Sequence, residues 1–597
     1  MDRAEKINSL KVLLQQNGLQ GMIIPTNDPH FSEYTQKHYS VREWLSGFDG
    51  SAGTLVITLE ASALWTDSRY FVKATSDLKG SNIKLMKIKM PDTPSIPEWI
   101  NSLYPNGASI AIDESLFSYS EYISLKKELE PSCIKLISDP FDKIWKERPK
   151  IQFNNIRLVN SKYSGEESYS KLERITNKIY SSCNIQGNFA YIVSACDEVA
   201  WLCNIRGNDI EYNQIPQSYA IITHNAIHLF VDSTIVNDEI VEYLHKNKVE
   251  LHNYNTFNNT LKDLKGQTVI CSPNKITVKD FKTIQESGAN IIYDPIPGGL
   301  VNYMKSIKNE YEIAGFRLAY KEDGIAWCRL LKFIHDSLKI NKQLTEYEIS
   351  NKLIELRKNC SDYLEESFEP IIAFGQNAAL PHYSATKNNT SFIENDNFLL
   401  MDTGAQYIYG TTDTTRTIPI GDISEEQKKF YTLVLKGMID LTLAKFPKNT
   451  RGSQLDILAR GPLFNEAVMY FHGTGHGIGH NLCVHEGPQS IRMEENPATL
   501  EPGMVISNEP AIYFEGKYGI RTENTILVKE WKNNNFNEFY CFETLTLVPI
   551  ATSCIDKTLL SLQEINWIEN YNKNVLETLK AYLTESEVNW LKEFISI

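Results

Sequence analysis

Short apolar and β-branched runs predict β-strands in several parts of the chain. The first two are Met22 to Pro25 and Thr54 to Thr58, and a third apolar run extends from Asn397 to Thr403. Two later segments, Thr411 to Ile418 and Tyr518 to Val528, are rich in threonine and other β-branched residues, which are enriched in strands. We therefore expect a strand in each of these segments.

Apolar positions at helical spacing predict a long helix from Ile307 to Leu338. Its broad apolar face comprises Ile313, Phe316, Leu318, Ile325, Leu330, Leu331 and Ile334. The N-terminal segment, residues 1–21, is charged and amphipathic and lacks the continuous apolar core of a signal peptide. No stretch of the sequence is long enough to span a membrane, so we expect a cytoplasmic protein without a membrane partner.

The chain has 597 residues, which is too long for a single core and predicts two to four domains. Composition shifts near residues 147–149 and 294–299 predict domains at 1–150, 151–300 and 301–597. Residues 53–68 and 218–233 both follow the pattern strand, turn, strand, Asp-Ser. This favours a diverged duplication, although a common hairpin pattern would look the same. For the third domain, periodicity alone supports only a mixed α+β fold.

Composition and charge narrow the class of partner. The net charge of −14 argues against nucleic acid as a main partner, and 42% apolar with 22% charged residues is ordinary for a globular protein. Ten cysteines are scattered without CxxC pairs, so neither a zinc ribbon nor a disulfide framework is indicated. A reducing compartment fits this cysteine usage.

Four acids and one histidine, far apart in the chain, together predict a site for two divalent metal ions. They are Asp402, Asp413, His476, Glu509 and Glu523. Such an oxygen-rich set without cysteine suits manganese, zinc, cobalt or iron. Two divalent cations would cancel the four carboxylate charges and activate a water molecule as nucleophile. Taken singly, each acid is more often a turn or loop residue, so the joint pattern carries the prediction.

The predicted strands bring some of these residues together. A hairpin of the segments before and after residues 404–410 would place Asp402 beside Asp413. Alternation along Tyr518 to Val528 places Arg521 and Glu523 on one face of a strand. We therefore expect the Arg521 guanidinium to neighbour the metal carboxylates and to hold one of them in a fixed orientation.

The glycine-rich run around His476 matches neither of two familiar motifs. The third glycine of a dinucleotide-binding G-x-G-x-x-G motif would fall on Ile478 or His480, so that fingerprint fails. The HExxH zinc motif also fails, because Gly473 follows His472 where glutamate is required. The glycines more plausibly permit tight backbone packing around the metals and substrate.

The candidate ligands lie in three longer segments, MDTGAQYIYGTTDTTRT, FHGTGHGIGHNLCVHEGP and SNEPAIYFEGKYGIRTEN. These segments resemble the catalytic domain of aminopeptidase P, the Xaa-Pro aminopeptidase branch of the creatinase and methionine aminopeptidase superfamily. The segments WTDSRYF, DEVAWLCNIRG and FETLTLVPI are similar to the long cytosolic form, so the resemblance covers the whole chain. It implies that Asp402 binds one metal, that His476 and Glu509 bind the other, and that Asp413 and Glu523 bridge them.

The resemblance also implies a fold, a cofactor and a substrate. The fold would be of the α/β and α+β classes, with two creatinase N-terminal-like α/β domains followed by a pita-bread catalytic domain. The cofactor would be two divalent ions per chain, with manganese ahead of zinc or cobalt. The substrates would be peptides with proline at the second position. A homodimer is expected, with its interface in the catalytic domain.

Further residues receive roles by the same resemblance. Three histidines, His382, His472 and His485, would line the substrate cleft and assist proton transfer, although a lone histidine is more often structural. Arg69 would reach toward bound peptide, although most such arginines are salt-bridged at the surface. The chemistry of the Xaa-Pro bond, not the resemblance, suggests a role for Glu509: it would take the proton from the attacking water, while the histidines orient the carbonyl and assist the proline nitrogen, which must be protonated to leave.

Alternative functions remain open at the level of sequence. Prolidase shares the metal ligands but cleaves Xaa-Pro dipeptides. A catalytically inactive peptide-binding module is the alternative from another class, since relatives of this fold have lost the metal. Methionine aminopeptidases are usually much shorter, and creatinase lacks these ligands. The two long N-terminal domains and the five retained ligands favour the Xaa-Pro aminopeptidase.

Overall fold

The computed structural model describes residues 1–596, which form two compact units. Unit 1 comprises Met1–Leu158, Glu166–Glu211 and Ile215–Val301. Unit 2 comprises Val159–Gly165, Tyr212–Gln214 and the chain from Asn302 onward. Both predicted N-terminal domains thus fall almost entirely within unit 1, and the bounds at residues 150 and 300 stay predictions.

Two six-stranded sheets of the same topology form the framework of unit 1. The first has the order β4-β3-β2-β1-β5-β6 and the second the order β12-β11-β10-β8-β13-β14. The strands of the first sheet are β1 (Gly21–Ile24), β2 (Thr54–Thr58), β3 (Ser62–Thr66), β4 (Ile83–Lys87), β5 (Ser109–Asp113) and β6 (Cys133–Ile137). Those of the second are β8 (Phe189–Val193), β10 (Tyr219–Ile222), β11 (Ile227–Val231), β12 (Val249–Asn253), β13 (Thr268–Cys271) and β14 (Asn290–Tyr293).

The pairing pattern is repeated from one sheet to the other. In each, a central strand pairs antiparallel with one hairpin and parallel with the following strand, and both outer pairs are parallel. The predicted repeat segments form the corresponding hairpins, β2–β3 and β10–β11. The common topology is what a diverged duplication of these segments would produce.

The helices of unit 1 are α1 (Arg3–Gln16), α2 (Val41–Ser46), α3 (Phe71–Asp77), α4 (Ile96–Leu103), α5 (Tyr119–Glu128), α7 (Ser168–Cys183), α8 (Cys196–Leu202), α9 (Asp238–Lys246), α10 (Phe257–Lys262) and α11 (Val278–Ser287). Four of them, α3, α5, α9 and α11, join the outer parallel strand pairs, because a parallel pair requires a crossover. A short pair, β7 (Arg157–Leu158) and β9 (Ile205–Arg206), lies outside the two sheets. No described helix is both long and apolar enough to cross a bilayer.

Unit 2 is built on curved antiparallel strands flanked by long helices. One sheet has the order β21-β28-β27-β24-β22-β23, and smaller sheets have the orders β16-β17-β20, β15-β18-β19 and β25-β26. The strands are β15 (Tyr363–Glu366), β16 (Ile371–Phe374), β17 (Asn397–Thr403), β18 (Ala405–Tyr407), β19 (Gly410–Thr411), β20 (Thr414–Ile420), β21 (Lys445–Pro447), β22 (Gly475–Gly477), β23 (Glu486–Ile491), β24 (Val505–Asn508), β25 (Ala511–Phe514), β26 (Tyr518–Arg521), β27 (Asn524–Asn533) and β28 (Glu538–Thr544).

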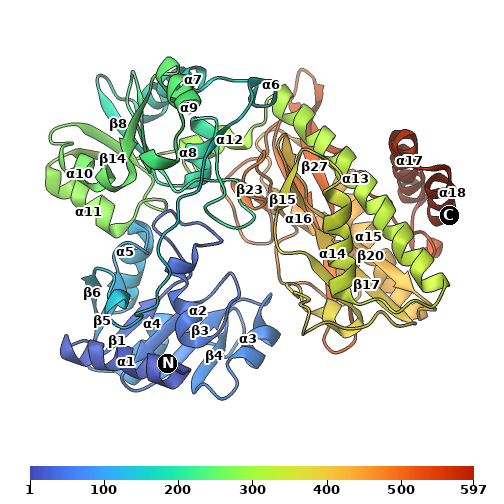
Figure 1. The fold of residues 1–597 in the computed structure, drawn as a ribbon, viewed down its shortest axis with the longest axis horizontal. Helices are drawn as coiled ribbons and strands as arrows, with labels where there is room; N and C mark the ends of the chain where they lie inside the picture. The colour runs from blue at the N-terminus through green and yellow to red at the C-terminus, as the bar shows by residue number, and fades with distance from the viewer. Residues whose placement is uncertain (597) are drawn as a thin grey trace. The chain divides into compact units, whose positions relative to one another are not determined.

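The long predicted helix is α13, which begins after the capping residue Asn309 and buries one face in the largest apolar core. Figure 1 shows α14 lying alongside it. Unit 2 contains α6 (Ser161–Ser164), most of α12 (Leu300–Ser306), α13 (Glu310–Lys339), α14 (Glu346–Arg357), α15 (Glu425–Thr442), α16 (Gly452–Phe464), α17 (Leu562–Leu579) and α18 (Glu585–Phe594). A 3-10 helix, η5 (Gly375–Ala379), packs against β17 and β26.

Two strand predictions need correction. The predicted single strand Tyr518 to Val528 is two strands, β26 and β27, because the chain leaves the β25–β26 hairpin at residues 522–523 and joins β24. The predicted strand Thr411 to Ile418 is also interrupted, with Asp413 in the gap between β19 and β20. In both cases a candidate metal ligand occupies the break, where the backbone passes from one sheet to another.

Candidate metal centre

The first two candidate ligands lie at the neighbouring ends of two paired strands, as the hairpin prediction requires. Asp402 is the penultimate residue of β17, and its register partner on β20 is Thr415. Asp413 immediately precedes β20, one residue beyond the last pair of this ladder. The strands β18 and β19 form a short excursion between them into another sheet. Both carboxylates are buried.

The remaining candidates reach the same place from the other sheets of unit 2. His476 lies on β22, Glu509 follows β24, and Glu523 lies between β26 and β27. The Nε2 atom of His476 is 3.4 Å from Asp413 Oδ2 and 3.4 Å from Glu509 Oε1. Asp413, His476 and Glu523 each have one possible metal-ligating atom, and these three atoms all lie within 4.8 Å of one another. The structure thus brings the separated residues into one cluster.

Two buried carboxylate oxygens show that the cluster fits cations. Asp402 Oδ1 and Glu523 Oε1 accept no hydrogen bond, whereas the second oxygen of each carboxylate has a donor, from Arg521 and Thr415 respectively. An unpaired buried carboxylate oxygen is costly, because it loses water without gaining a partner. Divalent cations would satisfy both atoms, and carboxylates with one imidazole are suitable ligands for them.

Mutual repulsion and burial perturb the acids of the cluster. Burial raises the pKa of Asp402 and Glu523, and neighbouring carboxylates add to the rise. Burial also raises the pKa of Glu509 to about 7, opposed by His476. For His476, burial opposes protonation, but Asp413 and Glu509 prevail and raise its pKa to about 9. Without cations, the site therefore favours bound protons near neutral pH.

Arg521 supports one carboxylate of the cluster from β26. Its Nη2 donates to Asp402 Oδ2, its Nη1 donates to Tyr513 OH at 2.6 Å, and its Nε donates to Thr415 Oγ1 at 3.2 Å. The guanidinium is buried. Because its donors have a fixed planar arrangement, it restricts the orientation of Asp402.

Comparison with known proteins assigns the chain to a family. The model of metallopeptidase family M24 matches residues 316–530, and that of its C-terminal region matches 538–596. Creatinase/prolidase N-terminal domain models match residues 6–144 and 147–312. A probable Xaa-Pro aminopeptidase P from Fusarium vanettenii is 37% identical over 99% of this chain and 98% of the relative. The chain belongs to the Xaa-Pro aminopeptidase P group of metallopeptidase family M24.

Two further relatives agree with this assignment. Aminopeptidase P2 from Arabidopsis thaliana is 34% identical over 98% of this chain and 87% of its own length. The crystal structure of X-prolyl aminopeptidase from Caenorhabditis elegans, described as a cytosolic enzyme with a di-nuclear active site, superposes with a TM-score of 0.94. It is 32% identical, and the match covers 100% of both chains. The expected family and fold class, with creatinase N-terminal domains ahead of an M24 catalytic domain, are confirmed.

Two of the three candidate histidines of this M24 chain contact the cluster or a residue that supports it. The ring of His485 meets that of His476 edge to face, with centroids 4.3 Å apart. His472 Nε2 is 2.9 Å from Tyr513 OH, the hydroxyl that also accepts from Arg521. His480, which has no predicted role, is buried near Phe316.

The two remaining candidate site residues are His382 and Arg69. His382 is partly buried in the turn that follows η5. Arg69 belongs to unit 1, where it makes two hydrogen bonds to the Asp67 carboxylate, at 2.9 Å and 2.8 Å. A purely structural arginine would make the same ion pair. A peptide-binding role for Arg69 therefore stays a prediction.

Several residues that support the cluster were not identified from sequence. Tyr513 connects Arg521 with His472, and Thr415 donates to Glu523 Oε2 at 2.8 Å. Ser507 Oγ donates to Glu509 Oε1 at 3.2 Å. Thr415 and Ser507 lie two residues from Asp413 and Glu509, so period-two alternation from a ligand gives a usable signal for them.

Backbone packing around His476 explains the glycines beside it. A Cβ atom on Gly475 would lie 1.9 Å from the carbonyl oxygen of Ser507 on the neighbouring strand. No side chain fits at that distance, so glycine permits β22 to approach β24. Next to His485, the buried carboxylate of Glu486 is held between the ammonium groups of Lys305 and Lys308. The close approach of Gly475 to Ser507 and the ion pairs of Glu486 thus hold in place the two segments that carry His476 and His485.

Proposed function

We propose that this chain is a metal-dependent aminopeptidase that hydrolyses the bond between the N-terminal residue and a proline at the second position. The proposal rests on the cluster of four carboxylates and His476, in which two buried carboxylate oxygens accept no hydrogen bond. Full-length similarity to Xaa-Pro aminopeptidases P supports the choice of substrate.

The proposed ligand arrangement follows the resemblance. Asp402 would hold one divalent cation, His476 and Glu509 the other, and Asp413 and Glu523 would lie between the two. We propose manganese as the physiological ion, with zinc or cobalt as substitutes, since this ligand set accepts several borderline ions. When bound, the two cations would lower the pKa of an attacking water and polarise the scissile carbonyl.

Glu509 is the proposed general base. Its carboxylate is partly buried, and its Oε1 atom lies 3.4 Å from His476 Nε2, so it can accept a proton from a water molecule held at the cluster. Ser507 donates to one of its oxygens and restricts its orientation. Glu509 would remove a proton from the attacking water and pass it toward the proline nitrogen.

The histidines are proposed to serve the leaving group. A bond before proline has no N–H, so the enzyme cannot hold the substrate by that donor, and departure of proline requires protonation of its nitrogen. His472, which contacts the Tyr513 hydroxyl, and His485, which packs against the ring of His476, would orient the carbonyl and assist this transfer. His382 receives the same role by resemblance alone.

The decisive experiment compares two substrates under controlled metal content. Chelator-stripped protein would be assayed for amino-acid release from an Xaa-Pro-Pro tripeptide and an Xaa-Pro dipeptide, with and without manganese. Manganese-dependent cleavage of the tripeptide alone is expected. Preferential cleavage of the dipeptide would instead establish prolidase activity, and absence of hydrolysis with manganese, zinc or cobalt would indicate a peptide-binding module.

The role of Glu509 can be separated from simple loss of metal. Glu509→Gln should lose turnover by at least about a hundredfold, the range expected for a general base, while retaining bound manganese. The matched control is Glu515→Gln, because Glu515 is an exposed acid in the same region of the chain. Unchanged turnover in Glu509→Gln would refute the assignment.

Arg69 is proposed to bind the more distant part of longer peptides. Arg69→Ala should raise the Michaelis constant for peptides longer than three residues and leave that for the tripeptide unchanged. An unchanged Michaelis constant for longer peptides would identify the Arg69–Asp67 pair as purely structural.

We also propose three domains, at 1–150, 151–300 and 301–597, in a cytoplasmic homodimer. The family models that match 6–144, 147–312 and 316–530 support this division. The relative from Caenorhabditis elegans is described as cytosolic, which supports the location. Light scattering of the full chain would measure the dimer, and a monomeric mass at micromolar concentration would contradict it.

A further inference from the structure

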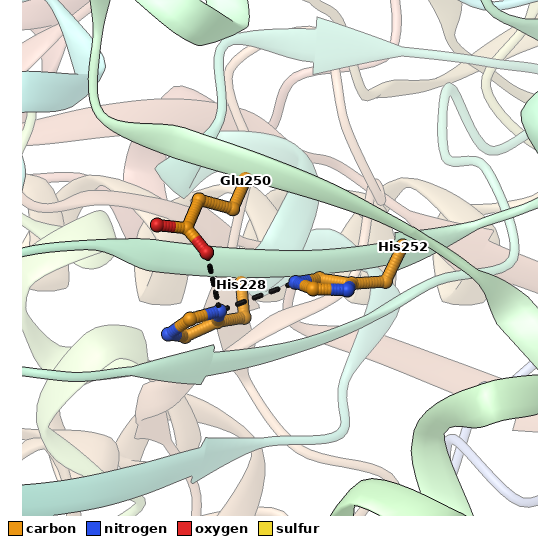
Figure 2. Close-up of side chains that lie close together, drawn as sticks. All are labelled: His228, Glu250 and His252. Carbon is orange, nitrogen blue, oxygen red and sulfur yellow. Dashed lines mark hydrogen bonds and ion pairs between the residues drawn. The ribbon is translucent and has the colours of Figure 1, made fainter.

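A second group of potential metal ligands lies in unit 1, on the sheet formed by β8 and β10–β14. It consists of His228, Glu250 and His252 (Figure 2). His228 lies on β11 and the other two lie on the adjacent edge strand β12. Because β11 and β12 are parallel and in register, His228 pairs with Glu250, and His252 follows on the same face two residues later.

The two distances from His228 to its partners are close to those between neighbouring ligands of one metal ion. His228 Nδ1 is 3.2 Å from Glu250 Oε2 and 3.2 Å from His252 Nε2. Tetrahedral ligands at the usual zinc distances of about 2.0–2.1 Å are separated from each other by about 3.3–3.4 Å. Both contacts are therefore close to the edge length of a tetrahedron around a single zinc-sized ion.

Direct hydrogen bonding accounts for these contacts less completely. A neutral imidazole carries one N–H, so the Nδ1 atom of His228 can donate to Glu250 or to His252 but has only one proton for both. Figure 2 shows both side chains directed at this one nitrogen. Partial burial lowers the pKa of His228, which favours the neutral imidazole that a metal requires.

The ring of His252 is held in place by its surroundings. It stacks on Phe230, with ring centroids 5.0 Å apart and an angle of 23° between the planes. Phe230 is fully buried and is the register partner of His252 on β11. Because this stacking restricts the His252 ring, metal binding would cause a smaller loss of conformational entropy.

We propose that His228, Glu250 and His252 bind one divalent cation of the borderline class, such as zinc, cobalt, nickel or copper. Two imidazoles and one carboxylate are typical ligands of these ions, whereas calcium and magnesium prefer oxygen alone. The side chains of Glu250 and His228 are 60% and 27% exposed, so the ion can enter from solvent, and water can complete its coordination. The ion would join β12, an edge strand, to the rest of the sheet.

The test is a zinc count on the untagged full chain after removal of metal with a chelator. Wild type should bind one zinc ion per chain more than the double variant His228→Gln/His252→Gln. The matched control is His224→Gln, because His224 is an exposed histidine in the turn before β11 and lies outside the cluster. It should bind as much zinc as wild type. Since only a difference is counted, the result does not depend on loading of the carboxylate centre.

A second readout locates the ion. Amide hydrogen exchange of the peptide that contains residues 249–253 should slow on addition of zinc in wild type and in His224→Gln, but not in the double variant. Turnover of an Xaa-Pro-Pro tripeptide by manganese-loaded protein should be equal in all three. Equal zinc counts in wild type and the double variant, or zinc-independent exchange of β12, would overturn the proposal and leave the contacts as hydrogen bonds.

Discussion

Metal loading of the carboxylate centre should displace protons, and their number follows from the geometry of the cluster. At pH 7 the metal-free site holds a proton on His476, since Asp413 and Glu509 raise the pKa of that imidazole to about 9. Burial and three neighbouring acids hold the pKa of Glu523 well above its usual range, which favours the protonated form of its carboxyl. Glu509, with a pKa of about 7, is near half-protonated.

Each ligand must lose its proton before it can bind a cation. Binding of two manganese ions at pH 7 should therefore release about one proton per chain from His476, with further parts from Glu509 and Glu523. By linkage, the overall affinity for the two ions should rise at least about tenfold for each pH unit in this range.

The same values set the stability of the metal-free protein. The pKa of Glu509 is raised from 4.5 and that of His476 from 6.5, so both groups favour the folded state at low pH. This contribution is lost as the pH rises, between 4.5 and about 7 for Glu509 and between 6.5 and about 9 for His476. Each shift corresponds to roughly 3 kcal/mol in the free energy of unfolding.

Titration calorimetry in two buffers with different enthalpies of protonation would measure the proton release. Glu523→Gln should release fewer protons than wild type, because its amide binds no proton in this range. Asp280→Asn is the matched control, since Asp280 is a buried acid of unit 1 with its pKa raised to about 6. It should release as many protons as wild type. Loading of manganese at pH 7 without measurable proton release would refute the electrostatic reasoning.

Three further predictions concern stability, each measured by urea unfolding. Glu486→Gln leaves two buried ammonium groups without their carboxylate and should lower the free energy of unfolding by about 3–5 kcal/mol, whereas the exposed-pair control Glu538→Gln should cost less than about 1 kcal/mol. In wild type, the free energy of unfolding should fall by about 3 kcal/mol as the pH rises from about 4 to 7, because burial raises the pKa of the Asp280 carboxyl to about 6. Asp280→Asn should abolish this fall. Gly519→Ala would put a Cβ atom 1.8 Å from a carbonyl oxygen of η5 and should destabilise by more than about 1–3 kcal/mol. Gly461→Ala on α16 should cost less, because its Cβ atom would meet no other segment within 4 Å and only the following Pro462 disfavours alanine there. Equal effects of the paired substitutions, or an unchanged pH profile in Asp280→Asn, would contradict these assignments.

The strands and helices with strong local patterns were predictable from sequence. The run Asn397 to Thr403 is β17 as predicted, and the helix predicted from Ile307 is α13, which begins at Glu310. The hairpin that joins Asp402 to the region of Asp413 also follows from local pattern, because the two segments pair in antiparallel register. Local periodicity failed at residues 522–523, where the backbone changes sheets and tertiary pairing overrides the continuous β-branched pattern.

The sequence by itself determined the chemical inventory of this protein: an oxygen-rich ligand set, a nearby arginine and two similar N-terminal halves. These depend on residue type and order, which local pattern and resemblance to a family can read. Only the tertiary structure decided how the inventory is used. The orphaned oxygens of Asp402 and Glu523, the Tyr513 hydroxyl shared by Arg521 and His472, and the convergence of His228 with Glu250 and His252 arise from pairing between separate segments. Such contacts depend on sheet register and burial, and neither is encoded by spacing along the chain.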